Sequence, residues 1–111
     1  MAFERLSSLE QEIVFQCMRA AEAFIDDWEK HARLGLGSKQ LRAVIDSWPH
    51  VRDNKEESEG FLAINNSLNE VCHGIHISTE DWGKWFDVPL SEVQSTYRKW
   101  RALKEIDGGI R

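Results

Sequence analysis

Inward-facing apolar positions recur at the same spacing in two stretches of the chain. In residues 27–48, an aspartate–tryptophan pair is followed by a short polar stretch, a Leu-Gly-Leu turn and four positions at 0, +3, +4 and +7. Residues 81–100 repeat this order with an Asp-Val-Pro turn. Such spacing places the four positions on one face of a helix. The pattern predicts two related helix-turn-helix-like hairpins, over about residues 26–49 and 79–107. The four positions are Leu41, Val44, Ile45 and Trp48 in the first stretch and Val93, Thr96, Tyr97 and Trp100 in the second.

The first part of the chain also has helical periodicity. Ser7 and Glu10 have the spacing of a capping box, which predicts a helix start near Ser7. The apolar stripe continues to Trp28, so either one long helix runs to Leu34 or the helix breaks near Asp26. The matching tryptophan of the second stretch lies just inside a predicted helix, which favours the break.

The remaining segments predict further helices and no strand. Pro49 ends a helix that Ser38 can cap, and the polar stretch 49–60 lacks periodicity and is expected to be an exposed loop. Another amphipathic helix is expected over about 61–74, and the last over about 89–107. The sequence therefore predicts an all-α fold of five or six short helices in a single domain that spans the chain.

Composition is that of a folded protein with its own core. Hydrophobic residues make up 41% of the 111 residues and charged residues 30%, with only two prolines. The start lacks the pattern of a signal peptide, and no apolar run approaches the length of a membrane span. The two cysteines, Cys17 and Cys72, lie in separate apolar stripes, as buried reduced thiols would. We therefore expect a cytoplasmic protein that does not act at a membrane.

The last predicted helix carries the residues best suited to contact a nucleic acid or a partner. Four positive charges and no negative one fall within residues 98–104, although a helix C-terminus also favours cations through its dipole. The net charge of −5 repels phosphate, and residues 79–107 hold five basic and six acidic side chains. DNA binding is therefore an alternative rather than the leading hypothesis. The outward residues with suitable chemistry are Gln94, Ser95, Arg98, Lys99 and Arg101.

The sequence offers little for catalysis or metal binding. One cluster with ligand chemistry exists, in residues 72–76, and it lacks the second pair of ligands that a structural zinc site needs. No nucleophile elbow, phosphate-binding glycine loop or zinc-protease motif is present. We therefore expect no enzymatic activity, no metal, no cofactor and no small-molecule substrate. An enzyme would need a concave pocket around Asn65, Asn69 and His73 on the polar face of the fourth helix.

Two side chains have an expected structural or interface role. Asn65 borders an apolar stripe and is expected to bond free backbone groups at the turn of the first hairpin. The tryptophans are expected to lie mostly in the core by their spacing. Trp85, three residues after Trp82 and adjacent to Phe86, is a candidate interface anchor.

Three short stretches resemble a group of small uncharacterised bacterial proteins. They are residues 27–31, 41–49 and 63–68, about a fifth of the chain. The resemblance implies no activity, cofactor or substrate. At the level of pattern, both hairpins also resemble trihelical helix-turn-helix units. The leading hypothesis is a small non-enzymatic regulatory or protein-interaction module that binds another protein or itself; the alternative is a DNA-binding regulator using helix 89–107.

Overall fold

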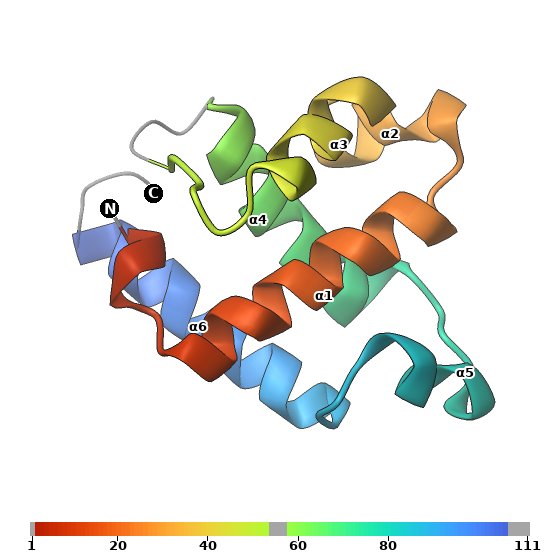
Figure 1. Ribbon diagram of the computed structural model, residues 1–111. Helices are drawn as coiled ribbons and strands as arrows, with labels where there is room; N and C mark the ends of the chain where they lie inside the picture. Colours follow the sequence, from red (N-terminus) through yellow and green to blue (C-terminus); the bar gives the residue numbers. More distant parts are fainter. Residues whose placement is uncertain (1, 54–57, 107–111) are drawn as a thin grey trace.

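The computed structural model describes residues 2–53 and 58–106, and in these ranges the secondary structure consists of helices with short connections and no strand (Figure 1). This confirms the predicted fold class, with six α-helices in the described ranges. A 3₁₀ turn, η1 (Ala2–Arg5), precedes the first helix, and a π-helical segment, η2 (Glu70–Gly74), continues the fourth. The α-helices are α1 (Ser8–Phe24), α2 (Asp27–Leu34), α3 (Ser38–Asp46), α4 (Glu59–Asn69), α5 (Thr79–Trp85) and α6 (Leu90–Ile106).

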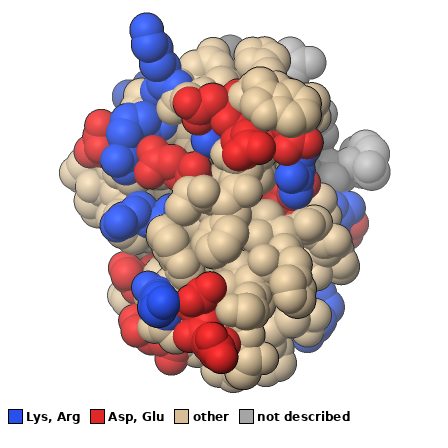
Figure 2. All heavy atoms as spheres, turned by 90° about the vertical axis from the view of Figure 1, so that its right-hand side faces the viewer, with Lys and Arg blue, Asp and Glu red and all other residues tan. Residues whose placement is uncertain are grey.

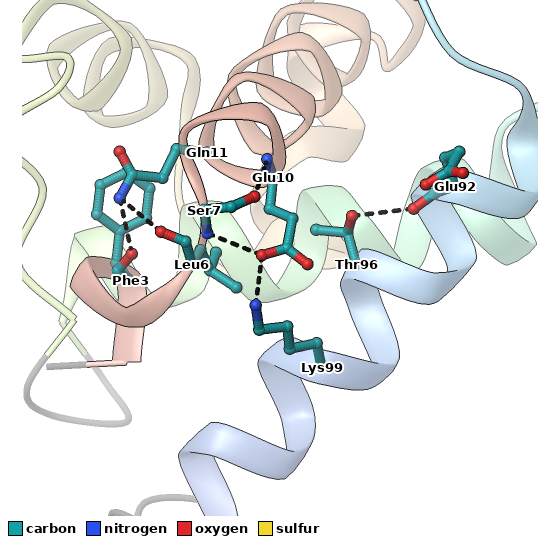
Figure 3. Close-up of polar contacts among 8 residues, drawn as sticks. All are labelled: Phe3, Leu6, Ser7, Glu10, Gln11, Glu92, Thr96 and Lys99. Carbon is teal, nitrogen blue, oxygen red and sulfur yellow. Dashed lines mark hydrogen bonds and ion pairs between the residues drawn. The ribbon is translucent and has the colours of Figure 1, made fainter.

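Local signals account for where the first helices begin and end. The Glu10 amide donates to the Ser7 hydroxyl at 3.1 Å, and the Ser7 amide donates to the Glu10 carboxylate at 2.8 Å (Figure 3). This capping box confirms the predicted start of α1. The predicted break at Asp26 is also confirmed, because Asp26 is the N-cap of α2. Gly35 ends α2 with a φ of 77°, a conformation that favours glycine.

Other boundaries differ from the prediction by a residue or two. Gly37 rather than Ser38 is the N-cap of α3, and α4 begins at Glu59 behind the cap Ser58. The predicted exposed loop is partly buried, since Val51 and Asp53 are packed inside. Residues 54–57 of that loop lie outside the described residues, as does the predicted end of the last helix at residue 107.

The core forms where α1 and α4 pack against each other. Each of them also contacts both α3 and α6, so four helices share one apolar interior (Figure 1). All of the predicted inward positions except Trp48, which is half-buried, are buried. Thr96 is the polar member of this set, and its hydroxyl donates to the Glu92 carbonyl at 2.9 Å (Figure 3). The +3, +4, +7 spacing therefore predicted the buried faces of α3 and α6.

The opening tryptophans of the two hairpins are not equivalent. Trp28 is 80% exposed, which contradicts its expected place in the core. It lies about half a helical turn from Lys30, which α2 buries together with Leu34. Trp82 is half-buried, stacks on Phe86 at 4.3 Å and donates its indole N–H to the Val88 carbonyl at 2.7 Å. The hairpins thus share the buried face of their second helix, and not the packing of their first.

The amide side chains of α4 join separate elements. The Asn66 side chain, rather than that of Asn65, donates to the Leu34 carbonyl at the end of α2, at 2.7 Å. Asn65 instead accepts a hydrogen bond from the Trp100 indole at 3.1 Å. The predicted link from α4 to the first turn is therefore present, and the prediction was wrong about the residue that makes it.

Within the described residues, no helix has both the length and the apolar character needed to cross a membrane.

Gly60 should be required by close packing at the start of α4. A Cβ atom added there would lie 1.9 Å from the Arg52 carbonyl oxygen, so backbone would have to move. We expect Gly60→Ala to lower the free energy of unfolding by about 1–3 kcal/mol. Gly83→Ala is the matched control, because a Cβ there meets nothing within 4 Å and should stabilise α5 by about 0.5–1 kcal/mol. Thermal unfolding of both variants measures the difference, and equal melting temperatures would contradict the prediction.

Candidate functional site

An open pocket of about 530 Å³ lies between η2 and α6. On α6 its residues follow i, i+3, i+4 and i+7 spacing, so they share one face of the helix. On the other side, the π-helical turn is closed by the Ile75 amide, which donates to the Glu70 carbonyl at 2.7 Å. Such π-turns are frequent at functional sites. The lining residues are Asn69, Cys72, His73, Gln94, Tyr97, Arg98 and Arg101, and we call this the η2–α6 pocket.

A short chain of polar contacts orders one wall of the η2–α6 pocket. The Tyr97 hydroxyl donates to the Asn69 side-chain oxygen at 3.3 Å. The Arg101 guanidinium donates to the same hydroxyl at 3.3 Å and lies 5.7 Å from the centroid of the Tyr97 ring. The His73 and Tyr97 ring centroids are 6.4 Å apart. Tyr97 therefore positions the Arg101 guanidinium, and Tyr97 is itself positioned by Asn69 of α4.

The pocket is electropositive. None of the described residues that line it is acidic, and in the described part of the chain neither Arg98 nor Arg101 forms an ion pair with a carboxylate. Glu70, at the start of η2, is instead paired with Arg33 of α2. Two guanidinium groups thus face the pocket with no neutralising carboxylate.

The Cys72 thiol in the pocket wall is not activated. Burial raises its pKa above the ordinary value, and the nearby positive charge of Arg98 offsets this only in part. A thiol with a raised pKa is neutral near pH 7 and is a poor nucleophile. Across the described residues, no three His, Cys, Asp or Glu side chains lie close enough together to hold a metal ion. Of the three residues expected around an enzyme pocket, Asn69 and His73 line the η2–α6 pocket. The third, Asn65, does not line it and accepts a hydrogen bond from Trp100.

The five predicted contact residues of α6 divide between two faces. Gln94, Arg98 and Arg101 line the η2–α6 pocket, and Ser95 is exposed on the adjacent face with Lys99. The Lys99 ammonium lies 2.6 Å from the Glu10 carboxylate at the start of α1 (Figure 3). Burial by itself raises the pKa of Glu10, but the hydrogen bonds from Lys99 and Ser7 outweigh it and leave the pKa below the ordinary value.

The cationic run at the end of α6 is therefore not a continuous positive stripe. Lys104, its fourth cation, is 2% exposed. Arg98 and Arg101 remain as the exposed cations of the run without a carboxylate partner among the described residues. A recognition helix for DNA would need more of these side chains free to reach phosphates and bases.

A second surface surrounds α5. All seven residues of this helix are described, and each keeps part of its surface exposed. Trp85 is half-buried, with its ring edge-on to Phe24 at 5.5 Å. Leu90 and Phe24 are 39% and 38% exposed. Leu90 also lines a pocket of about 310 Å³, together with Ile77, Thr79, Trp82, Gly83 and Pro89.

We call these residues, with Phe24 and Trp85, the α5 surface. Figure 2 shows the side of the molecule that carries α2 and α5, where a continuous band of uncharged residues is bordered by acidic and basic clusters. The sequence pointed to Trp85 alone. The sequence did not indicate that Ile77, Trp82 and Leu90 line one pocket. These residues come from three separate segments, namely the connection before α5, α5 itself and the start of α6.

Comparisons of the chain with protein-family models, with curated proteins and with solved structures found no match. The resemblance to small bacterial proteins therefore stays a prediction. The function has to be inferred from the chemistry of the η2–α6 pocket and the α5 surface.

Proposed function

We propose that this protein is a small non-enzymatic interaction module that binds another protein through the α5 surface. The observation that carries the proposal is that two tryptophans of one short helix stay partly exposed, and that one of them, Trp82, lines an open apolar pocket, while Trp85 lies three residues further along the same helix. Aromatic side chains of this kind are enriched at the centres of protein interfaces, where burial of their remaining surface stabilises a complex. Contiguous exposed apolar surface on a folded domain commonly marks such a site.

The charge around the α5 surface indicates the chemistry of the partner. Residues 77–92 hold four acidic side chains and one basic one, Lys84, which is paired with Asp81 at 2.9 Å. An apolar pocket on a segment with this excess of acidic side chains favours a partner segment that combines an aliphatic or aromatic anchor with flanking Lys or Arg. Such a segment belongs either to a different protein or to a second copy of this chain.

The alternative, DNA binding through α6, rests on Arg98 and Arg101. The engagement of Lys99 by Glu10 and the burial of Lys104 reduce its support. It predicts duplex affinity that falls steeply with salt and is reduced by Arg98→Ala or Arg101→Ala. Absence of any retardation of duplex DNA at low salt would eliminate it.

Leu90→Asp should weaken partner binding at least about tenfold, since it places a charge in the apolar pocket. Peptides selected from a random display library against the protein should combine an apolar anchor with Lys or Arg, and their dissociation constants can be measured by fluorescence anisotropy. Leu9→Asp is the matched control: Leu9 is also an exposed leucine near the start of a helix, at 57% exposure, but belongs to α1.

The two variants give separable outcomes. Loss of peptide binding in Leu90→Asp and retention in Leu9→Asp supports the proposal. If sedimentation shows that the protein dimerises and that Leu90→Asp is monomeric, the partner is a second copy. Equal binding by both variants, or peptides without the apolar and basic pattern, would mean that the α5 surface is not the binding site.

A further inference from the structure

We propose that the η2–α6 pocket is a separate binding site for a small organic anion, whose carboxylate or phosphate group contacts Arg98 and Arg101. The described residues that line it are not shared with the α5 pocket, so this site is independent of the proposed protein interaction. Its volume of about 530 Å³ is within the range of small-molecule sites, roughly 300–1,000 Å³.

The first support is uncompensated charge. Arg98 and Arg101 are three residues apart on α6 and reach the same pocket. The acidic residue of η2, Glu70, does not line the pocket and forms an ion pair with Arg33 of α2. Guanidinium groups bind carboxylates and phosphates through paired N–H donors, and the gain is larger where no protein carboxylate competes.

The second support is the surplus of hydrogen-bond donors. The Asn69 oxygen already accepts from the Tyr97 hydroxyl, which leaves the Asn69 amide nitrogen as a donor. Gln94 adds a second amide group, and the two arginines add guanidinium donors. An ionised carboxylate or phosphate only accepts hydrogen bonds, so it matches this lining better than a neutral or cationic ligand does.

The third support is preorganisation. Arg101 is held by the Tyr97 hydroxyl and lies over its ring, and Tyr97 is held by Asn69. Side chains that are ordered before binding lose less conformational entropy when the ligand arrives. The Tyr97 ring and the neutral Cys72 thiol form an uncharged wall, which can accommodate an apolar body attached to the anionic group.

The test is an NMR titration of the full-length ¹⁵N-labelled protein at low salt and neutral pH. Three anionic probes are used, namely inorganic phosphate, phenyl phosphate and benzoate, with benzyl alcohol as the neutral probe. We expect saturable shifts of the amides in residues 69–73 and 94–101 for the anions and none for benzyl alcohol. Tighter binding of phenyl phosphate than of benzoate would identify the ligand class as organic phosphates, and the reverse order would identify carboxylates.

Matched variants distinguish specific binding in the η2–α6 pocket from nonspecific electrostatic attraction. Arg98→Gln and Arg101→Gln should each weaken anion binding about tenfold or more. Arg19→Gln should not, although Arg19 is also an exposed arginine with an aromatic neighbour, 5.9 Å from the centroid of the Phe15 ring. Circular dichroism confirms that the variants fold. Absence of saturable shifts with every anion, or an equal loss of binding in Arg19→Gln, would overturn the proposal.

Discussion

Trp100→Ala should lower the free energy of unfolding by about 3–5 kcal/mol, which is the range for truncation of a large aromatic side chain in a core. The Trp100 side chain is completely buried, and its ring centroid lies 5.9 Å from that of Phe61. Its indole N–H donates to Asn65 at 3.1 Å. The substitution therefore opens a cavity between α4 and α6 and also leaves the Asn65 oxygen without this donor.

Trp28→Ala is the control for the same chemical change, at the tryptophan that opens the first hairpin. Trp28 is 80% exposed, so its removal should change the free energy of unfolding by no more than about 0.5 kcal/mol. Urea unfolding followed by far-ultraviolet circular dichroism measures both variants without relying on tryptophan fluorescence. Similar losses in the two variants would show that the buried and exposed assignments are wrong.

Asp53→Ala should lower the free energy of unfolding by about 3–5 kcal/mol, because it leaves the ammonium group of Lys104 buried without its counter-charge. Asp53 is 0% and Lys104 2% exposed, and the Lys104 nitrogen lies 3.2 Å from the Asp53 carboxylate. The same carboxylate accepts from the Ala2 amide at 3.1 Å. One side chain therefore ties the start of the chain and the end of α6 to the loop after α3.

Two further variants test whether the unpaired charge is the cause. Asp46→Ala removes an exposed aspartate that pairs with Arg42 at 3.4 Å, and should cost no more than about 1 kcal/mol. Adding Lys104→Met to Asp53→Ala should restore a large part of the lost stability, since neither position then carries a buried charge. Urea unfolding measures all of these variants. A double variant no more stable than Asp53→Ala would point to lost packing instead of lost charge balance.

The positions of the helices follow from short stretches of sequence. The capping pair Ser7 and Glu10, the glycine at position 35 and the +3, +4, +7 spacing in α3 and α6 all act within about two helical turns. Interactions of this range are visible in the order of residues, so the all-α fold, the break at Asp26 and the buried faces could be predicted.

The same local pattern could not predict how the first helix of each hairpin packs. Asp27-Trp28 and Asp81-Trp82 are identical pairs in sequence, yet Trp28 is exposed and Trp82 is stacked on Phe86. The difference depends on which elements lie opposite: α2 packs on α3 and α4, whereas α5 packs on α1. Nothing within either pair encodes those neighbours.

The candidate sites depend on the tertiary structure for the same reason. The sequence by itself determined that α6 carries a run of cations with no acid among them. Only the tertiary structure decided that Lys99 meets Glu10, that Lys104 is buried beside Asp53, and that Arg98 and Arg101 face a pocket with Asn69. Helix formation depends on groups a few residues apart, whereas the environment of a charge depends on side chains brought to it by folding from distant parts of the chain.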